Sequence, residues 1–289
     1  MKVTRLDEAE ARPRKVAVGE FDGVHLGHRE VIRGSDTVLT FEPHPLQVIR
    51  PEAAPKLLTS LDRKVELLEG LGVEELVLIE FDRAFAQRSA QEFVDGVLAG
   101  TLQATRVSVG ENFRFGHKAA GDPALLAEQD AFETRVTPLV EVDQEIVSST
   151  LIRHLIQLGD VERANRLLGD PFQLRGTVVE GDRRGRTLGY PTANLVPDEA
   201  LVYPGHGVYA AYADGKPAAV SVGVRPTFGT GRGVLVEAFL IDFEGDLYGT
   251  ELQLDFVRRL RGERAFPTVD ALVEQMGKDV AEAASVTSR

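Results

Sequence analysis

The chain contains no cysteine, and this absence removes several kinds of chemistry from its 289 residues. It can form no disulfide, no thiolate metal site and no cysteine nucleophile. The absence does not identify the compartment, because a cysteine-free protein persists in either redox environment. The lack of cysteine therefore excludes thiol-based chemistry, and the localisation has to be predicted from other features.

A long apolar run and an excess of positive charge are missing as well. No stretch of about 18 apolar residues could form a membrane span, and the opening residues MKVTRLDEAEARPRK are too charged for a secretory signal. We therefore expect a cytoplasmic protein without a membrane partner. The formal net charge of −12 argues against nucleic acid as a partner, because binding to its phosphates needs an excess of Lys and Arg.

Length and pattern predict two domains of different class. The chain is too long for one ordinary core, and its 43% hydrophobic and 27% charged residues are typical of a globular protein. The first part alternates between strand and helix patterns and ends in a helical pair at 150–158 and 161–168, after which short alternating segments dominate. This predicts an α/β plus all-β protein. Residues 1–172 hold a parallel sheet, and residues 173–289 form a small antiparallel β-barrel closed by a helix at 269–280.

The expected elements of the first domain bring three segments to one edge of its sheet. Helices are predicted after Thr59 and after a capping box of Ser89 and Glu92, the second ending at Gly100. Strands are predicted at residues 15–18, 37–41, 75–81 and 106–109. Ligands of parallel sheets bind at the carboxyl ends of the strands. That edge should therefore be lined by the segments that directly follow strands: GEFDGVHLGH (19–28), FEPHP (41–45) and GENFRFG (110–116).

The segment GEFDGVHLGH holds two of the six histidines, His25 and His28, together with three glycines. Zinc binding is the weakest interpretation, because catalytic zinc needs a third protein ligand and HxxH without the HExxH arrangement is poor evidence for it. Histidines that only cap and pack the following helix are a second possibility. The glycines, however, let the backbone approach a ligand closely, and the helix start offers free N–H groups and a positive dipole end. Together these features indicate a phosphate-binding cradle.

The order of strand, glycine-bracketed FDG and HxGH resembles the signature of the nucleotidyltransferase family. The resemblance implies a Rossmann-like domain in which His25 and His28 stabilise charge on the phosphates. In that chemistry the partner's phosphate attacks the α-phosphate of a nucleotide, and pyrophosphate leaves. The other phosphate-binding residues that the resemblance implies are Gly19, Phe21, Asp22, Gly23 and Gly27.

The stretch VSSTLIR (147–153) resembles the second signature of the same family. Taken alone, SST is an ordinary helix cap, and Arg153 is an ordinary exposed arginine. The resemblance instead implies that Ser149, Thr150 and Arg153 bind the nucleotide.

FEPHP and GENFRFGHKAAGD resemble segments of one branch, the bacterial bifunctional riboflavin kinase/FMN adenylyltransferases. The resemblance extends from about Val16 to Val280. The alternative for the second segment is that its two phenylalanines belong to the core, as alternate aromatics after a strand usually do. The resemblance implies that this segment binds flavin through Asn112, Phe113, Arg114 and Phe115.

The second domain opens with GTVVEGDRRGRTLGYPTANL (176–195), which on composition alone predicts a hairpin with a solvated basic turn. It also resembles the riboflavin kinase signature, in which a glycine-rich loop covers the ATP phosphates and PTAN holds Mg²⁺. A P-loop kinase is excluded because GxxxxGK[ST] is absent. The matching residues are Gly181, Arg186 and Gly189 in the loop and Thr192 and Asn194 in PTAN.

Glu237 interrupts the apolar strand VLVEAFLIDF with a carboxylate. An inward-facing acid is costly unless it is paired or used, whereas an outward-facing one needs no explanation. The resemblance implies that Glu237 is the general base that takes the proton from the riboflavin hydroxyl during phosphoryl transfer.

Two features depart from the pattern of the family. Only residues 29–36 separate the HxGH helix from the strand before the PHP motif, where relatives usually carry a longer segment. Glu20 stands where a small or hydroxyl residue is expected. An acid beside a phosphate site is unfavourable unless its side chain points away.

The residues and the resemblance together predict an enzyme with two sites. ATP phosphorylates riboflavin to FMN in the barrel, and a second ATP adenylylates FMN to FAD in the first domain, with Mg²⁺ as cofactor and a monomer as the default state. An enzyme limited to the kinase step and a non-catalytic flavin or nucleotide carrier are the alternatives. The carrier predicts the loss of catalytic groups, whereas these are all present: Glu237, Thr192, Asn194, His25 and His28.

Overall fold

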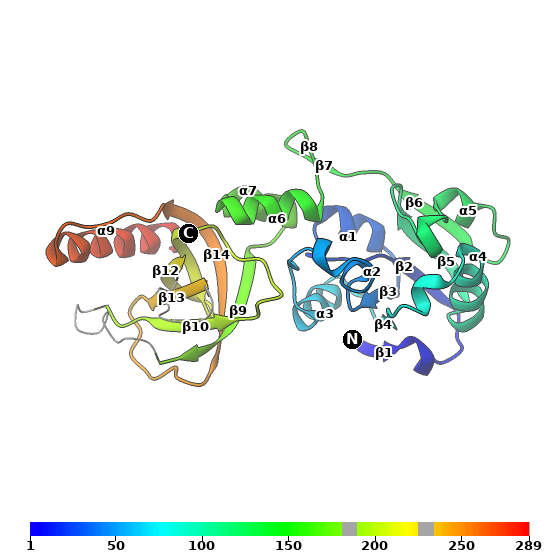
Figure 1. Cartoon of the computed structure of the whole chain (residues 1–289), viewed down its shortest axis with the longest axis horizontal. Helices are drawn as coiled ribbons and strands as arrows, with labels where there is room; N and C mark the ends of the chain where they lie inside the picture. The colour runs from blue at the N-terminus through cyan, green and yellow to red at the C-terminus, as the bar shows by residue number, and fades with distance from the viewer. Residues whose placement is uncertain (181–189, 225–233, 289) are drawn as a thin grey trace. The chain divides into compact units, whose positions relative to one another are not determined.

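The computed structural model describes residues 1–180, 190–224 and 234–288 (Figure 1). The chain divides into two compact units, Met1–Ser149 and Thr150–Arg289. Each unit has a principal sheet of its own. The helical pair before residue 172 is grouped with the second unit, and the boundary between 172 and 173 stays a prediction.

A six-stranded parallel sheet in the order β1-β4-β3-β2-β5-β6 forms the centre of the first unit. Its strands are β1 (Lys2–Arg5), β2 (Arg14–Val18), β3 (Thr37–Glu42), β4 (Glu75–Glu80), β5 (Ala104–Gly110) and β6 (Glu133–Thr137). The four expected strands are confirmed as β2, β3, β4 and β5, whereas β1 and β6 were not expected. Because β3, β2 and β5 are parallel neighbours, the three motif segments that follow them share one edge, as expected.

Short helices join the strands of this unit. They are α1 (Leu26–Ile32), α2 (Pro45–Ile49), α3 (Leu61–Gly70), α4 (Ala90–Glu92), the π-helix η4 (Phe93–Thr101) and α5 (Pro123–Ala127). Shorter 3-10 turns are η1 (Leu6–Glu8), η2 (Pro51–Ala53), η3 (Phe85–Gln87) and η5 (His117–Ala119). A small hairpin pairs β7 (Glu141–Val142) with β8 (Glu145–Ile146).

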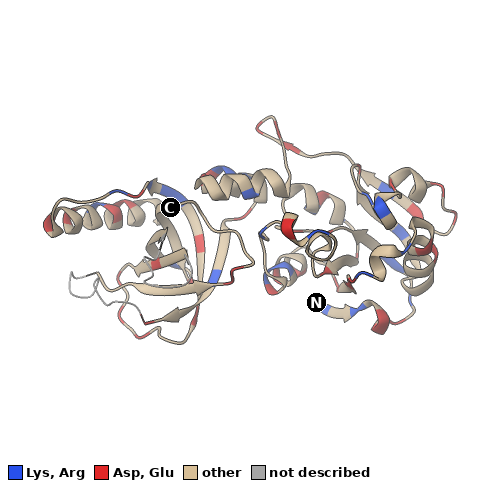
Figure 2. Ribbon diagram, in the orientation of Figure 1, with Lys and Arg blue, Asp and Glu red and all other residues tan. Residues whose placement is uncertain are grey.

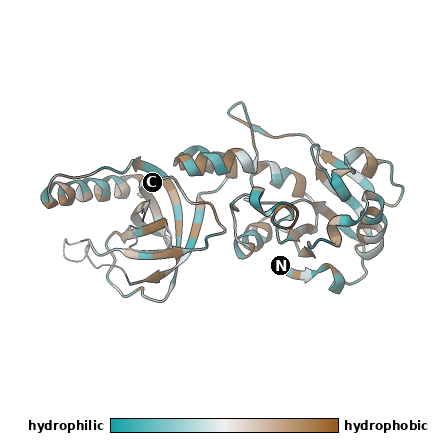
Figure 3. Ribbon diagram, viewed as in Figure 1, coloured by the Kyte–Doolittle hydropathy of each residue, from teal (hydrophilic) through white to brown (hydrophobic). Residues whose placement is uncertain are grey.

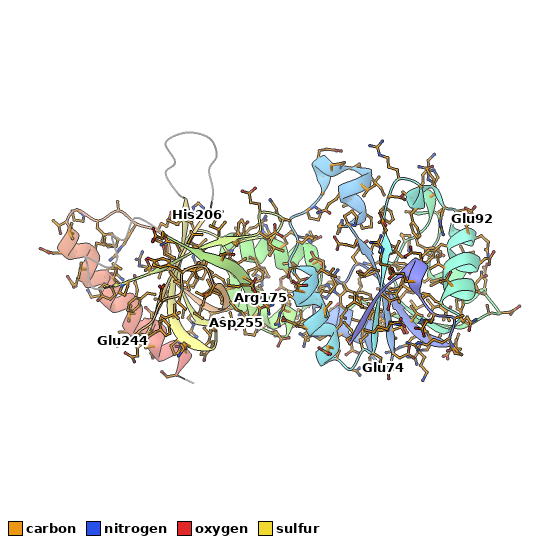
Figure 4. All side chains as sticks on the ribbon, turned by 90° about the horizontal axis from the view of Figure 1, so that it is seen from below. Glu74, Glu92, Arg175, His206, Glu244 and Asp255 are labelled. Carbon is orange, nitrogen blue, oxygen red and sulfur yellow. The ribbon has the colours of Figure 1, made fainter. Side chains whose placement is uncertain are left out.

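The helix boundaries follow from capping, and two differ from the sequence expectation. The capping box of Ser89 and Glu92 is confirmed at α4, and Glu92 is labelled in Figure 4. The helix expected after Thr59 has Ser60 as its N-cap, because the Ser60 hydroxyl accepts from a backbone N–H one turn on. The helix expected to end at Gly100 continues to Thr101, because its last residues form π-type turns.

Apolar side chains cover both faces of the parallel sheet, and hydrophobic segments are coloured brown on the ribbon in Figure 3. Successive residues of a strand point to opposite faces, so Val38 joins one core cluster and its neighbour Leu39 joins the other. Leu76 and Val77 on β4 divide in the same way. Burial on both faces is typical of parallel sheets, and it leaves the edge at the strand ends as the place where polar groups are accessible.

The second unit begins with two helices and continues into a closed barrel. The helices are α6 (Ser149–Leu158) and α7 (Val161–Leu168), and the strands are β9 (Phe172–Val179), β10 (Ala193–Pro197), β11 (Gly207–Ala213), β12 (Lys216–Val224), β13 (Val234–Leu240) and β14 (Glu251–Arg261). The strands close in the order β10-β13-β12-β11-β14-β9, with antiparallel pairs throughout. The predicted antiparallel barrel is confirmed. The helix expected over 269–280 is α9 (Val269–Thr287), which is longer than predicted.

The turn between α6 and α7 is fastened to the barrel. Gly205 N–H donates to the Ile156 carbonyl over 2.9 Å, and Arg259 donates to the Leu158 carbonyl over 3.2 Å. Gly159 has a φ of 83°, and a Cβ atom there would lie 2.6 Å from the Tyr209 hydroxyl oxygen. Glycine is therefore required at this turn both by the backbone and by the close approach of the barrel.

Polar pairs cover the outer face of the barrel between β9 and β14. The Arg175 guanidinium donates to the Gln253 side chain over 3.0 Å, and the Gln173 amide donates to Asp255 over 2.9 Å (Figure 4). Charged residues of both signs are interspersed over each unit (Figure 2). Among the described residues, no helix is both long enough and apolar enough to cross a membrane.

Candidate active sites of the two units

The loop between β2 and α1 holds the predicted cradle in an unusual backbone conformation. Phe21, Gly23 and Val24 have φ angles of 49°, 89° and 40°. A positive φ is unfavourable for a β-branched residue such as Val24 and costs about 1–3 kcal/mol. The Phe21 and Val24 side chains are buried in the core beneath the sheet edge. Their burial stabilises the tight turn that presents the loop backbone at the strand ends.

Asp22 fastens this loop to the segment before α3. Its buried carboxylate accepts hydrogen bonds from the backbone N–H groups of Leu58, over 2.8 Å, and Thr59, over 3.2 Å. The Thr59 hydroxyl in turn accepts from Gly23 N–H over 3.1 Å. Ser149 also reaches the loop, because its hydroxyl donates to the Asp22 carbonyl over 2.9 Å. Asp22 therefore shapes the cradle, and its contact with phosphate stays a prediction.

The two histidines stack at the start of α1. Their ring centroids lie 3.5 Å apart with an interplanar angle of 16°, and the edge of Phe21 packs on His28. His25 is 5% exposed, and its Nδ1 accepts from the His28 backbone N–H over 3.2 Å. His25 is thus the N-cap of the helix. Since Nδ1 accepts, the proton of the neutral His25 ring is on Nε2.

Burial keeps both rings neutral. Burial lowers the pKa of His25 to about 4, and the nearby Arg29 charge acts in the same direction. The pKa of His28 is held well below its usual range by burial first and then by His25 and Lys64. At pH 7 the pair therefore offers N–H donors rather than fixed positive charges. His28 Nδ1 is buried without a hydrogen-bond partner, so a ligand atom could bond it.

The flavin-binding candidates divide into core and surface residues. Phe115 is buried in the core, as the alternative interpretation expected, and it stacks on the half-buried Phe113 with ring centroids 5.5 Å apart. Asn112 and Arg114 are exposed on either side of Phe113. Phe113 is therefore the ring of this segment that a planar ligand can reach. Thr150 and Arg153 lie at the start of α6, and their part in nucleotide binding stays a prediction.

In the second unit, strand pairing brings Asn194 and Glu237 together. Asn194 on β10 is directly opposite Glu237 on β13, so their side chains share one face of the barrel wall. Val236 and Ala238 are fully buried on the other face, so Glu237 is on the outer face. Asn194 is nevertheless 7% exposed and Glu237 is half-buried. The Glu237 carboxyl group is therefore neither buried in the barrel interior nor fully exposed to solvent.

The described residues of this site offer oxygen donors of the kind that Mg²⁺ binds. Thr192 immediately precedes β10 and carries a hydroxyl group, while Asn194 contributes an amide oxygen beside the Glu237 carboxylate. Such a set suits a hard cation that completes its shell with water and ATP phosphates. The predicted loop residues Gly181, Arg186 and Gly189 lie outside the described residues.

Comparisons with known proteins assign each unit to a family. The model of the FAD synthetase family matches residues 7–151, and that of the riboflavin kinase family matches residues 168–287. The chain is 37% identical to the bifunctional riboflavin kinase/FMN adenylyltransferase of Bacillus subtilis, covering 93% of this chain and 90% of that protein. The chain belongs to the bifunctional riboflavin kinase/FMN adenylyltransferase family.

Other relatives of this family extend the similarity over nearly the whole chain. The bifunctional riboflavin kinase/FMN adenylyltransferase of Escherichia coli K12 is 35% identical, covering 96% of this chain and 94% of that protein. A crystal structure from Streptococcus pneumoniae, described as a macrolide-efflux protein, is 32% identical with a TM-score of 0.90. It covers 98% of this chain and 99% of that one. Similarity of sequence and of fold thus extends over nearly the whole chain.

Sequence reasoning missed one functional candidate, Lys64. It is buried on α3 and its Nζ donates to the Glu20 carbonyl in the cradle loop over 2.8 Å. Lys64 lies three residues after Leu61 and four before Leu68, so it belongs to the apolar stripe of the predicted helix. A lysine in such a stripe is the signal that could have identified it.

Proposed function

We propose that this chain converts riboflavin to FAD in two ATP-dependent steps. The barrel unit transfers the γ-phosphoryl group of ATP to the terminal hydroxyl of riboflavin and releases ADP. The α/β unit joins the adenylyl group of a second ATP to the FMN phosphate and releases pyrophosphate. The observation that carries the proposal is that each unit matches its own family model, one for each step.

Adenylyl transfer needs no protein nucleophile, because the FMN phosphate itself attacks the α-phosphate. The α/β unit contributes position and hydrogen bonds. Neutral His25 and His28 donate N–H groups to the phosphates, and the cradle backbone of Gly19, Phe21, Gly23 and Gly27 approaches them closely. The remaining proposed contacts are Ser149, Thr150 and Arg153 to the nucleotide and Asn112, Phe113, Arg114 and Phe115 to the flavin.

Phosphoryl transfer needs a base and charge neutralisation. Glu237 accepts the proton of the riboflavin hydroxyl, and its position opposite Asn194 on the barrel wall supports this role. Thr192 and Asn194 hold Mg²⁺, which neutralises charge on the ATP phosphates when it is bound. Gly181, Arg186 and Gly189 complete the proposed phosphate contacts.

Incubation of the purified protein with riboflavin, ATP and Mg²⁺, followed by separation of the flavins, tests the proposal. We expect FMN to form first and FAD to follow. FMN without FAD would limit the chain to the kinase step, and unchanged riboflavin would favour a non-catalytic carrier. A cytoplasmic location and a monomeric state stay predictions.

A further inference from the structure

Lys64 is a buried lysine that hydrogen-bonds to the backbone of the cradle loop. The two reactions proposed above assign it no role. Lys64 is 8% exposed, and its Nζ donates to the Glu20 carbonyl oxygen over 2.8 Å. The buried Thr40 hydroxyl donates to the same oxygen over 3.1 Å. One carbonyl of the loop is therefore fixed by two buried donors from different elements, α3 and β3. Burying an ammonium group costs free energy unless the group is paired. The burial of a lysine at this position therefore calls for an explanation.

Acidic groups surround the ammonium on several elements. Glu20 and Asp22 belong to the cradle loop, and Glu42 ends β3. All three interact electrostatically with Lys64, whose pKa is lowered by burial and raised in part by these acids. The ammonium also acts on the ring of His28, whose pKa it helps to lower. Lys64 is thus the cation shared by the loop acids and the histidine pair.

We propose that Lys64 is a positioning residue for adenylyl transfer: it fixes the cradle loop through the Glu20 carbonyl and places a positive charge beside the acids Asp22 and Glu42, so that a triphosphate can bind next to them. The proposal rests on the adenylyl transfer proposed above. Without the lysine, the loop would present uncompensated negative charge to ATP.

Glu20 is the group in this cluster that changes charge near neutral pH. Burial raises its pKa to about 8, with Asp22 and Glu42 adding to the increase and Lys64 opposing it. Glu20 is therefore mostly protonated at pH 7 and adds no charge beside the phosphates. Above about pH 8 it ionises, and the added negative charge opposes binding of ATP.

The test measures FAD formation from supplied FMN, and urea unfolding followed by circular dichroism reports the folding of each variant. Lys64→Met keeps the length of the side chain and removes its charge. We expect it to raise the KM for ATP about tenfold or more, with a smaller effect on kcat. Lys64→Arg, which keeps the charge, should recover most of this loss. Lys15→Met, which removes an exposed positive charge from the start of β2, is the matched control.

The pH profile provides a readout that a merely structural lysine would not change. In the unaltered protein the KM for ATP in FAD formation should rise above about pH 8. Glu20→Gln should remove this rise, and Lys64→Met should move it to higher pH, because Lys64 opposes the increase in the pKa of Glu20. Lys64→Met with an unchanged KM for ATP, or with the alkaline rise at an unchanged pH, would overturn the role of Lys64. An unaltered chain that phosphorylates riboflavin but makes no FAD would instead overturn adenylyl transfer itself.

Discussion

At the scale of the residue, burial in the fold, rather than the ordinary pKa of a histidine, determines the protonation state of His25. Its ring is buried, caps α1 through Nδ1 and is neutral in the folded protein. In the unfolded chain the same ring has the ordinary pKa of 6.5. At a pH between these two pKa values, His25 binds a proton in the unfolded chain but not in the folded protein. Lowering the pH therefore favours unfolding.

This difference predicts how the stability of the first unit depends on pH. As pH falls from about 6.5 to about 4, the buried neutral His25 should destabilise the folded unit by up to about 3 kcal/mol. His25→Asn keeps a capping acceptor and removes the titration. Urea unfolding followed by circular dichroism should show the unaltered protein losing stability relative to His25→Asn over this range. Parallel pH curves for the two proteins would contradict the assignment.

The residues of the cradle could be predicted from the sequence, but the protonation states of His25 and His28 could not. The spacing of His25 and His28 is visible in GEFDGVHLGH, and a phosphate cradle could be inferred from it. That both rings are neutral depends on burial against Phe21 and on Lys64 of α3. These contacts join segments far apart in the chain, so no local pattern reports them.

At the scale of the element, the pairing of β10 with β13 supports a prediction for the kinase site. Because Glu237 is opposite Asn194, Glu237→Gln should preserve the shape of the site and remove the base. Riboflavin phosphorylation should then fall by about 10²–10⁴ in kcat, measured by separation of the flavins. FAD formation from supplied FMN is the control and should be unchanged. A variant with near-normal phosphorylation would exclude Glu237 as the base.

The turn between α6 and α7 gives a second prediction at this scale. Gly159→Ala introduces a Cβ atom 2.6 Å from the Tyr209 hydroxyl oxygen at a φ of 83°. We expect a loss of about 2–4 kcal/mol in the unfolding free energy of the second unit, measured by chemical denaturation. Gly215→Ala is the matched control, because its φ is 77° with no atom within 4 Å of the added Cβ. It should cost roughly 1 kcal/mol, and equal losses in both variants would contradict the close-contact argument.

The elements that could be predicted are those whose pattern reflects burial. β2, β3 and β4 are largely apolar in their buried parts because both of their faces are covered, and all three were expected. β1 and β6 lie at the margins of the sheet, where only some of their side chains are buried. Their sequences, KVTR and ETRVT, therefore lack the apolar signal of a strand.

At the scale of the whole molecule, the two proposed sites should be separable within one chain. Asn194→Ala removes an oxygen ligand of the barrel site, where Asn194 is paired with Glu237 of the same unit. We expect FMN formation to be abolished while FAD formation from supplied FMN continues at its normal rate. Chromatography of the flavins from both reactions measures this. Loss of both activities in a folded variant would contradict two separate sites.

The closed barrel and the open parallel sheet differ in their tendency to self-associate. A barrel has no unpaired strand edge, whereas the six-stranded sheet ends in β1 and β6. An exposed edge is a template for pairing with another copy, and charged side chains oppose such pairing. Lys2 and Arg5 on β1, and Glu133 and Arg135 on β6, provide these charges. These charges therefore help to keep the flanks of the sheet from pairing with another copy in concentrated solution, and neutralising the four side chains should favour fibrous or precipitated protein.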